Sequence, residues 1–88
     1  GVGVNFKTKK VINGPDVQTR GLIYLKDAEH IIKEVGNIME ECINTAVEEK
    51  RYENLTVRGE ARDKIVRYLL KETGKRPMVL PVIIEINE

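Results

Sequence analysis

The chain has 88 residues, of which 41% are hydrophobic and 33% charged, a composition typical of one globular domain and not of a disordered segment. Its 15 Lys and Arg residues against 14 Asp and Glu residues leave a net charge of +1, which argues against a broadly basic nucleic-acid clamp. One cysteine and one histidine exclude an internal disulfide, a multi-cysteine zinc site and a histidine-rich metal site. We therefore expect residues 1–88 to form a single domain that is not itself an enzyme.

The sequence contains no segment that approaches the ~20 apolar residues needed to cross a bilayer. Its longest apolar run, residues 78–84, includes Pro81, so we expect no membrane partner. The first ten residues lack the apolar centre of a signal peptide and already have a strand pattern, which suggests a piece of a longer polypeptide. A free cysteine without a secretion signal favours the cytoplasm.

Short extended segments are expected in the N-terminal third of the chain. Val2, Val4 and Phe6 alternate with smaller or polar residues, which is the period-2 pattern of a strand. A second extended segment begins at residues 11–12 and is interrupted by a Gly-Pro-Asp turn. Extended structure can resume over residues 17–25, which would add a further strand to the sheet.

A long amphipathic helix is predicted over residues 27–49, because apolar residues recur at steps of three and four and occupy one face. Asp27 is a good candidate for its N-cap. A second helix should follow, with Asn54 or Thr56 as its cap and Gly59 in its opening turns.

The end of the second helix is clearer than its beginning. Gly74 suits a left-handed position after the last turn, Lys75 and Arg76 suit the negative end of a helix, and Pro77 prevents continuation. A strongly apolar strand over residues 78–86 closes the chain. The predicted fold is therefore α+β in the order β-β-α-α-β, with two helices packed on one face of a small three-stranded or four-stranded sheet.

The single histidine and the single cysteine could in principle be reactive, but each has a structural interpretation. His30 falls opposite the apolar face of the first helix and should be a solvated surface residue. Cys42 falls within that face, so we expect a buried thiol that packs as a small hydrophobe. We predict no catalytic and no metal-binding residue in this chain.

Two basic clusters could contact RNA. Near the N-terminus three lysines follow a phenylalanine, and two more cations follow the second helix. A solvated turn and a complement to the negative helix end are the favoured interpretations of these clusters, with contact to RNA as the alternative. A KH-type module is disfavoured, because the linker over residues 48–54 has no glycine for a Gly-x-x-Gly loop. The candidate RNA contacts are Lys7, Lys9, Lys10, Lys75 and Arg76.

Two segments carry a family resemblance. Residues 14–21 read Gly-Pro-Asp-Val-Gln-Thr-Arg-Gly, and residues 73–85 read Thr-Gly-Lys-Arg-Pro-Met-Val-Leu-Pro-Val-Ile-Ile-Glu. Together with the pair Arg62-Asp63, they resemble the C-terminal domain of ribonuclease J over nearly the whole chain. The motif residues, which we expect to have structural or assembly roles, are Gly14, Pro15, Asp16, Thr19, Arg20, Gly21, Gly74, Arg76, Pro77 and Pro81.

The resemblance implies a parent protein with a metallo-β-lactamase-type nuclease body. That body would use zinc and/or manganese or magnesium to hydrolyse RNA 5′→3′ and internally, and its His-x-His-x-Asp-His motif is not in this chain. This fragment should need no cofactor of its own. Its partners would be the parent nuclease domains, a second identical or paralogous ribonuclease J subunit, and RNA through the parent.

The leading hypothesis is thus an accessory domain that supports oligomer assembly and nuclease activity; the alternative is an RNA-contacting module that guides substrate. Gln18 and Leu22 depart from the family pattern and leave open whether the parent is active or a catalytically weak paralogue. The candidate self-association residues are those on the odd face of the last strand: Val79, Pro81 and Ile83.

Overall fold

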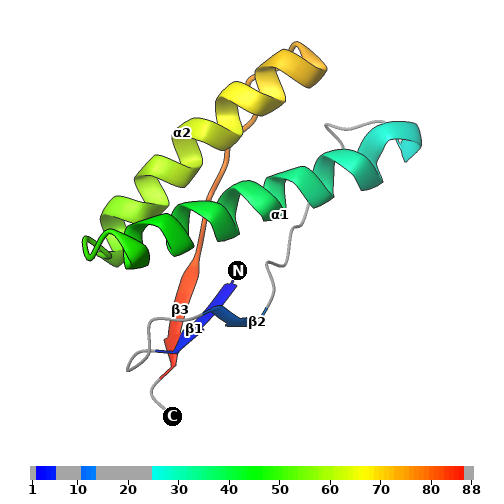
Figure 1. The fold of residues 1–88 in the computed structure, drawn as a ribbon. Coiled ribbons are helices and arrows are strands. Elements are labelled where there is room, and N and C mark those ends of the chain that lie inside the picture. Colours follow the sequence, from blue (N-terminus) through cyan, green and yellow to red (C-terminus); the bar gives the residue numbers. More distant parts are fainter. Residues whose placement is uncertain (1, 6–10, 14–24, 87–88) are drawn as a thin grey trace.

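Two long helices, α1 (Leu25–Glu48) and α2 (Asn54–Thr73), dominate the computed structural model, which describes residues 2–5, 11–13 and 25–86. They are preceded by the short strands β1 (Val2–Asn5) and β2 (Val11–Asn13) and followed by β3 (Ile83–Ile86). Figure 1 shows α1 and α2 side by side, with the strands lying beyond α1 and the segment after α2 running back to the sheet.

The first helix forms where the apolar periodicity predicts it, but it begins earlier. Leu25, which we expected to end an extended segment, is its first residue, and Asp27 therefore lies in the first turn and is not the N-cap. Acidic side chains in a first turn are favoured by the helix dipole, so Asp27 and Glu29 suit this earlier start equally well. The proposed strand over residues 17–24 lies outside the described residues.

The end of α1 has no glycine and uses Lys50 instead. The Lys50 backbone has a φ of 57°, in the left-handed region, and the Arg51 N–H donates to the Ala46 carbonyl at 2.8 Å. This is the bond pattern of a Schellman-type stop, in which glycine is the usual left-handed residue. The chain thereby reverses direction within a few residues and enters α2.

The N-cap of α2 is Glu53, and neither Asn54 nor Thr56 has this role. The Glu53 backbone is extended (φ −148°, ψ 126°), and the Glu53 carboxylate accepts hydrogen bonds from the N–H groups of Leu55 at 3.1 Å and Thr56 at 2.7 Å. The predicted stop is confirmed: Gly74 has a φ of 73°, and its N–H donates to the Leu70 carbonyl at 2.8 Å.

The core of the described residues lies mainly between the two helices. Ile43 and Ala46 of α1 and Val57 and Ala61 of α2 are fully buried, and the small alanines allow close approach near the connection. The other buried hydrophobic residues are Ile31, Met39, Cys42, Ile65, Leu69 and Ile83.

The three strands form a sheet in the order β2-β1-β3. β1 pairs antiparallel with β2, with an irregularity between Gly3 and Val4, and parallel with β3 from Val2 opposite Ile83 to Asn5 opposite Ile86. Because β1 and β3 are parallel, the chain must cross over between them, and the helix pair lies within that crossover.

The predicted fold class, a sheet that carries two helices on one face, is wrong as a description of this molecule. The helices contain 24 and 20 residues, whereas the strands contain 4, 3 and 4. Of the buried hydrophobic residues described, Ile83 alone belongs to a strand. The fold is mostly helical, because the helices bury their apolar faces against each other and little of that surface is left for a sheet.

Candidate functional site

The C-terminal motif begins with a helix stop. The Thr73 hydroxyl donates to the Leu69 carbonyl at 2.7 Å and accepts from the Lys75 N–H at 3.1 Å, so this threonine closes the turn that Gly74 permits. Lys75 and Arg76 are exposed beyond the last turn. The Thr-Gly-basic-basic part of the motif therefore has a clear structural role.

The segment from Met78 to Ile84 has one inward and one outward side. Val79 packs against the core, Pro81 is half-buried and Ile83 is buried. The residues between them point outward: Met78 is 84% exposed, Leu80 78%, Val82 51% and Ile84 56%. We call these four residues the apolar row.

This arrangement changes the candidate self-association surface. Val79, Pro81 and Ile83 belong to the inward side, and Ile83 in particular is used within the chain itself. A second protein that approaches this segment meets the apolar row instead. The odd-numbered and the even-numbered positions of this segment are both apolar, so the sequence pattern alone could not show which side is buried.

The outer edge of β3 is partly closed by side chains from the start of α2. β3 is the last strand of the described sheet, which leaves one edge without a strand neighbour among the described residues. There the Asn54 amide donates to the Ile83 carbonyl at 3.1 Å. Edge strands are commonly blunted by such cover, which disfavours pairing with another strand.

The same region contains a polar cluster that joins the helix connection to β3. The Tyr52 hydroxyl donates to Glu85 Oε1 at 2.9 Å, and the Asn54 amide donates to the same oxygen at 3.0 Å. Burial raises the pKa of Tyr52 to about 12, and the hydrogen bond to Glu85 acts in the same direction. At neutral pH this phenol is a hydrogen-bond donor that holds the strand, with no acid–base role.

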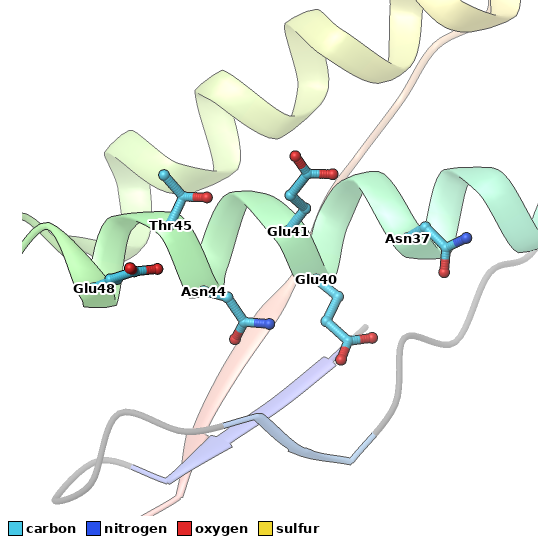
Figure 2. A pocket seen from close by; sticks show the side chains of 6 residues that line it. All are labelled: Asn37, Glu40, Glu41, Asn44, Thr45 and Glu48. Atoms are coloured by element: carbon cyan, nitrogen blue, oxygen red, sulfur yellow. The ribbon is translucent and has the colours of Figure 1, made fainter.

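A shallow recess lies on the exposed side of α1, with a volume of about 340 Å³ (Figure 2). All the side chains that line it are polar and come from one helix, so the recess has no wall from a second element. No histidine or cysteine is among the residues that line it, and Cys42, which follows Glu41 in the sequence, is buried. The arrangement offers no catalytic constellation; its residues are Asn37, Glu40, Glu41, Asn44, Thr45 and Glu48.

Cys42 and His30, the two potentially reactive side chains of α1, lie where the sequence predicts. Cys42 is free and buried, and desolvation raises the pKa of its thiol, which makes it a poor nucleophile. His30 is exposed. Within the described ranges there is no group of three or more His, Cys, Asp or Glu residues that could hold a metal ion. These residues do not suit the metals that the family resemblance implies for the parent.

The remaining candidates lie outside the described residues. These are the first motif, residues 14–21, and the lysines of the N-terminal cluster, Lys7, Lys9 and Lys10. Neither described helix is long and apolar enough to cross a membrane.

A group of exposed cations on α2 was not predicted from the sequence. Lys64, Arg67 and Lys71 lie one turn apart on the same side of the helix and continue toward Lys75 and Arg76. Their i, i+3, i+7 spacing was a detectable signal, because residues three and seven positions apart share a helix face.

Comparison with known proteins gives a consistent family match. A model of the family described as "Ribonuclease J C-terminal domain" matches residues 1–86. The chain is 34% identical over 85 residues to "Ribonuclease J 2" of Staphylococcus aureus, and equally to that of Staphylococcus epidermidis. These alignments cover 97% of this chain but 15% of each relative.

Proposed function

The chain belongs to the ribonuclease J C-terminal domain family, and from this premise we propose that it is the accessory domain of a longer ribonuclease chain, in which it holds subunits together. The nuclease body of that chain would supply metal-dependent RNA hydrolysis, 5′→3′ from RNA ends and internally, with zinc and/or manganese or magnesium held outside these residues. The free, buried Cys42 suits the reducing cytoplasm, where RNA turnover takes place.

The apolar row is the observation that carries this proposal. Four large apolar side chains without an intervening charge face outward along one segment of a small domain. Contiguous exposed apolar patches of this kind are uncommon on monomeric proteins and mark interaction surfaces. Their burial against a partner would be favourable by about 25 cal/mol for each Å² removed from water.

A second copy of the same domain is the occupant that we propose. The row is short and uncharged, so two copies related by a two-fold axis can place row against row without opposing like charges. Pro81 has no N–H, and Asn54 occupies the Ile83 carbonyl, so contact through side-chain faces is favoured over strand pairing. The row would supply a substantial part of the ~800 Å² per partner that a standard interface buries.

The double variant Met78→Gln/Leu80→Gln in the full-length protein tests this proposal. We expect a lower molar mass by light scattering, and reduced cleavage of single-stranded RNA if assembly supports activity. The matched control is Leu55→Gln, because Leu55 is 66% exposed on α2 but outside the row. An unchanged molar mass in the double variant would overturn the proposed surface, and a mass lost equally in the control would show a general effect of polarity.

A further inference from the structure

The exposed cations of α2 form a stripe that is separate from the apolar row. Lys64, Arg67 and Lys71 fall within a sector about 60° wide at 100° per residue, beside the buried face of the helix and not within it. Lys75 and Arg76 extend the stripe past Gly74. We call these five residues the α2 stripe.

Acidic residues on the same helix do not neutralise the α2 stripe. Glu60 precedes Lys64 by four positions, which is the favourable order for an ion pair along a helix. Its carboxylate instead accepts from Arg51 of the helix connection, at 2.9 Å and 3.3 Å. Arg51 thus occupies the acidic side chain best placed to pair with Lys64.

Two further acidic neighbours lie on α2, Asp63 and Glu72, and among the described residues Glu72 forms no ion pair. The Asp63 carboxylate lies 3.7 Å from Arg62, and the Arg67 guanidinium donates to the Asp63 backbone carbonyl at 3.4 Å. Among the described residues, no ion pair involves a member of the α2 stripe.

The near-zero net charge conceals a strong separation of charge between the helices. α1 contains six acidic and two basic residues, whereas residues 54–76 contain seven basic and three acidic residues. A local positive surface of this kind attracts a polyanion even when the net charge of the chain is close to zero.

We propose that the α2 stripe binds the phosphate backbone of single-stranded RNA. At 1.5 Å per residue, Lys64 and Lys71 are separated by about 10 Å along the axis, and Lys75 and Arg76 lie beyond the helix end, so the stripe is long enough to face more than one phosphate. No aromatic side chain belongs to the stripe, so bases would not stack on it and binding would be independent of sequence. This inference rests on the family assignment, and it concerns a surface different from that proposed for assembly.

The experiment measures binding of a fluorescently labelled single-stranded RNA by anisotropy, with full-length protein in the presence of a chelator that prevents cleavage. The triple variant Lys64→Gln/Arg67→Gln/Lys71→Gln removes three cations of the stripe while keeping good helix formers. The control, Lys33→Gln/Lys50→Gln, removes charge from exposed positions outside α2, and the two variants are compared per charge removed. Circular dichroism establishes that both variants are folded.

We expect the triple variant to bind roughly tenfold or more weakly at low salt. We also expect the slope of log affinity against log salt to become shallower by about 2, since each lost phosphate contact to a single strand contributes ~0.7. The control should remain close to the unmodified protein. Equal affinity in the triple variant, or an equal loss per charge removed in both variants, would overturn the proposal.

Molar mass separates the two proposals. If the triple variant loses subunits and keeps its RNA affinity, the α2 stripe binds an acidic protein surface and the RNA proposal is wrong. If it loses RNA affinity at unchanged mass, the RNA proposal is supported whatever the outcome for the apolar row.

Discussion

Tyr52 and Glu85 lie 33 positions apart in the sequence, and their side chains meet at 2.9 Å, with the phenol as donor. Tyr52 belongs to the connection between the two helices, and Glu85 belongs to β3. The bond therefore joins the turn of the helix pair to the strand in which the apolar row ends.

Removal of the Tyr52 hydroxyl should destabilise the fold. Tyr52→Phe leaves the Glu85 carboxylate with one fewer donor, and we expect a loss of about 1–2 kcal/mol in the free energy of unfolding. The control is Tyr68→Phe, because the Tyr68 hydroxyl is buried without a hydrogen-bond partner in the described part of the chain. That change should be neutral or slightly stabilising. Urea unfolding at a fixed protein concentration compares the two, and equal effects would contradict the role of the Glu85 bond.

Stability should fall at alkaline pH because of Tyr52. Its pKa is raised from 10.0 to about 12 in the folded chain, so the unfolded chain loses the phenolic proton first as pH rises. The stabilising contribution is complete below pH 10 and is lost as the pH approaches about 12. Tyr52→Phe should flatten this part of the profile, measured by urea unfolding. An unchanged alkaline slope in the variant would assign the effect to other groups.

Cys42 should react slowly with thiol reagents in the folded chain. It is buried, and desolvation raises the pKa of its thiol, so both access and thiolate are limited. Labelling should accelerate sharply in urea. Cys42→Ala removes a small packed group, whereas Cys42→Ser places a hydroxyl in an apolar site, and we expect serine to be the more destabilising. Rapid labelling of the native chain would show that the site opens readily.

Ile43 should be the most sensitive core position of α1, because its side chain is large and fully buried. Ile43→Ala should reduce the free energy of unfolding by about 2–5 kcal/mol, and Ile43→Val by about 0.5–1.5 kcal/mol. Leu55→Ala, at an exposed position on α2, is the control and should change it by less than about 0.5 kcal/mol. A similar loss at Leu55 would mean that this side chain is buried in solution.

The helices were predictable because their signals are local. Apolar spacing indicated α1 and α2, and Gly74 followed by Pro77 indicated the end of α2. The sheet was overestimated because strand length depends on pairing with distant residues, which the pattern within one segment does not report. Residues 78–82 have a strand-like sequence, yet β3 begins at Ile83.

The surfaces were less predictable than the elements. Residues 78–84 are apolar at both odd-numbered and even-numbered positions. Tertiary packing therefore determines that Val79 and Ile83 face the core. The unneutralised α2 stripe depends on a pair between Arg51 and Glu60, nine positions apart, which no helix-spacing rule anticipates. Glu53 was missed as a cap because Ser, Thr, Asp and Asn are the preferred residues there.

The Glu53 cap gives the chain an acid-sensitive step. The carboxylate accepts hydrogen bonds from the Thr56 hydroxyl at 2.7 Å and from two backbone N–H groups, and these bonds, led by that of Thr56, lower its pKa from 4.5. The unfolded chain therefore takes up the proton first as pH falls, so the contribution is complete above about 4.5 and is lost as pH falls through the lowered value. Glu53→Gln should weaken the cap at neutral pH and flatten the acid limb of the stability profile. Glu49→Gln, at an exposed carboxylate outside the cap, is the control, and a variant of Glu53 that keeps the full acid limb would show that another carboxylate causes it.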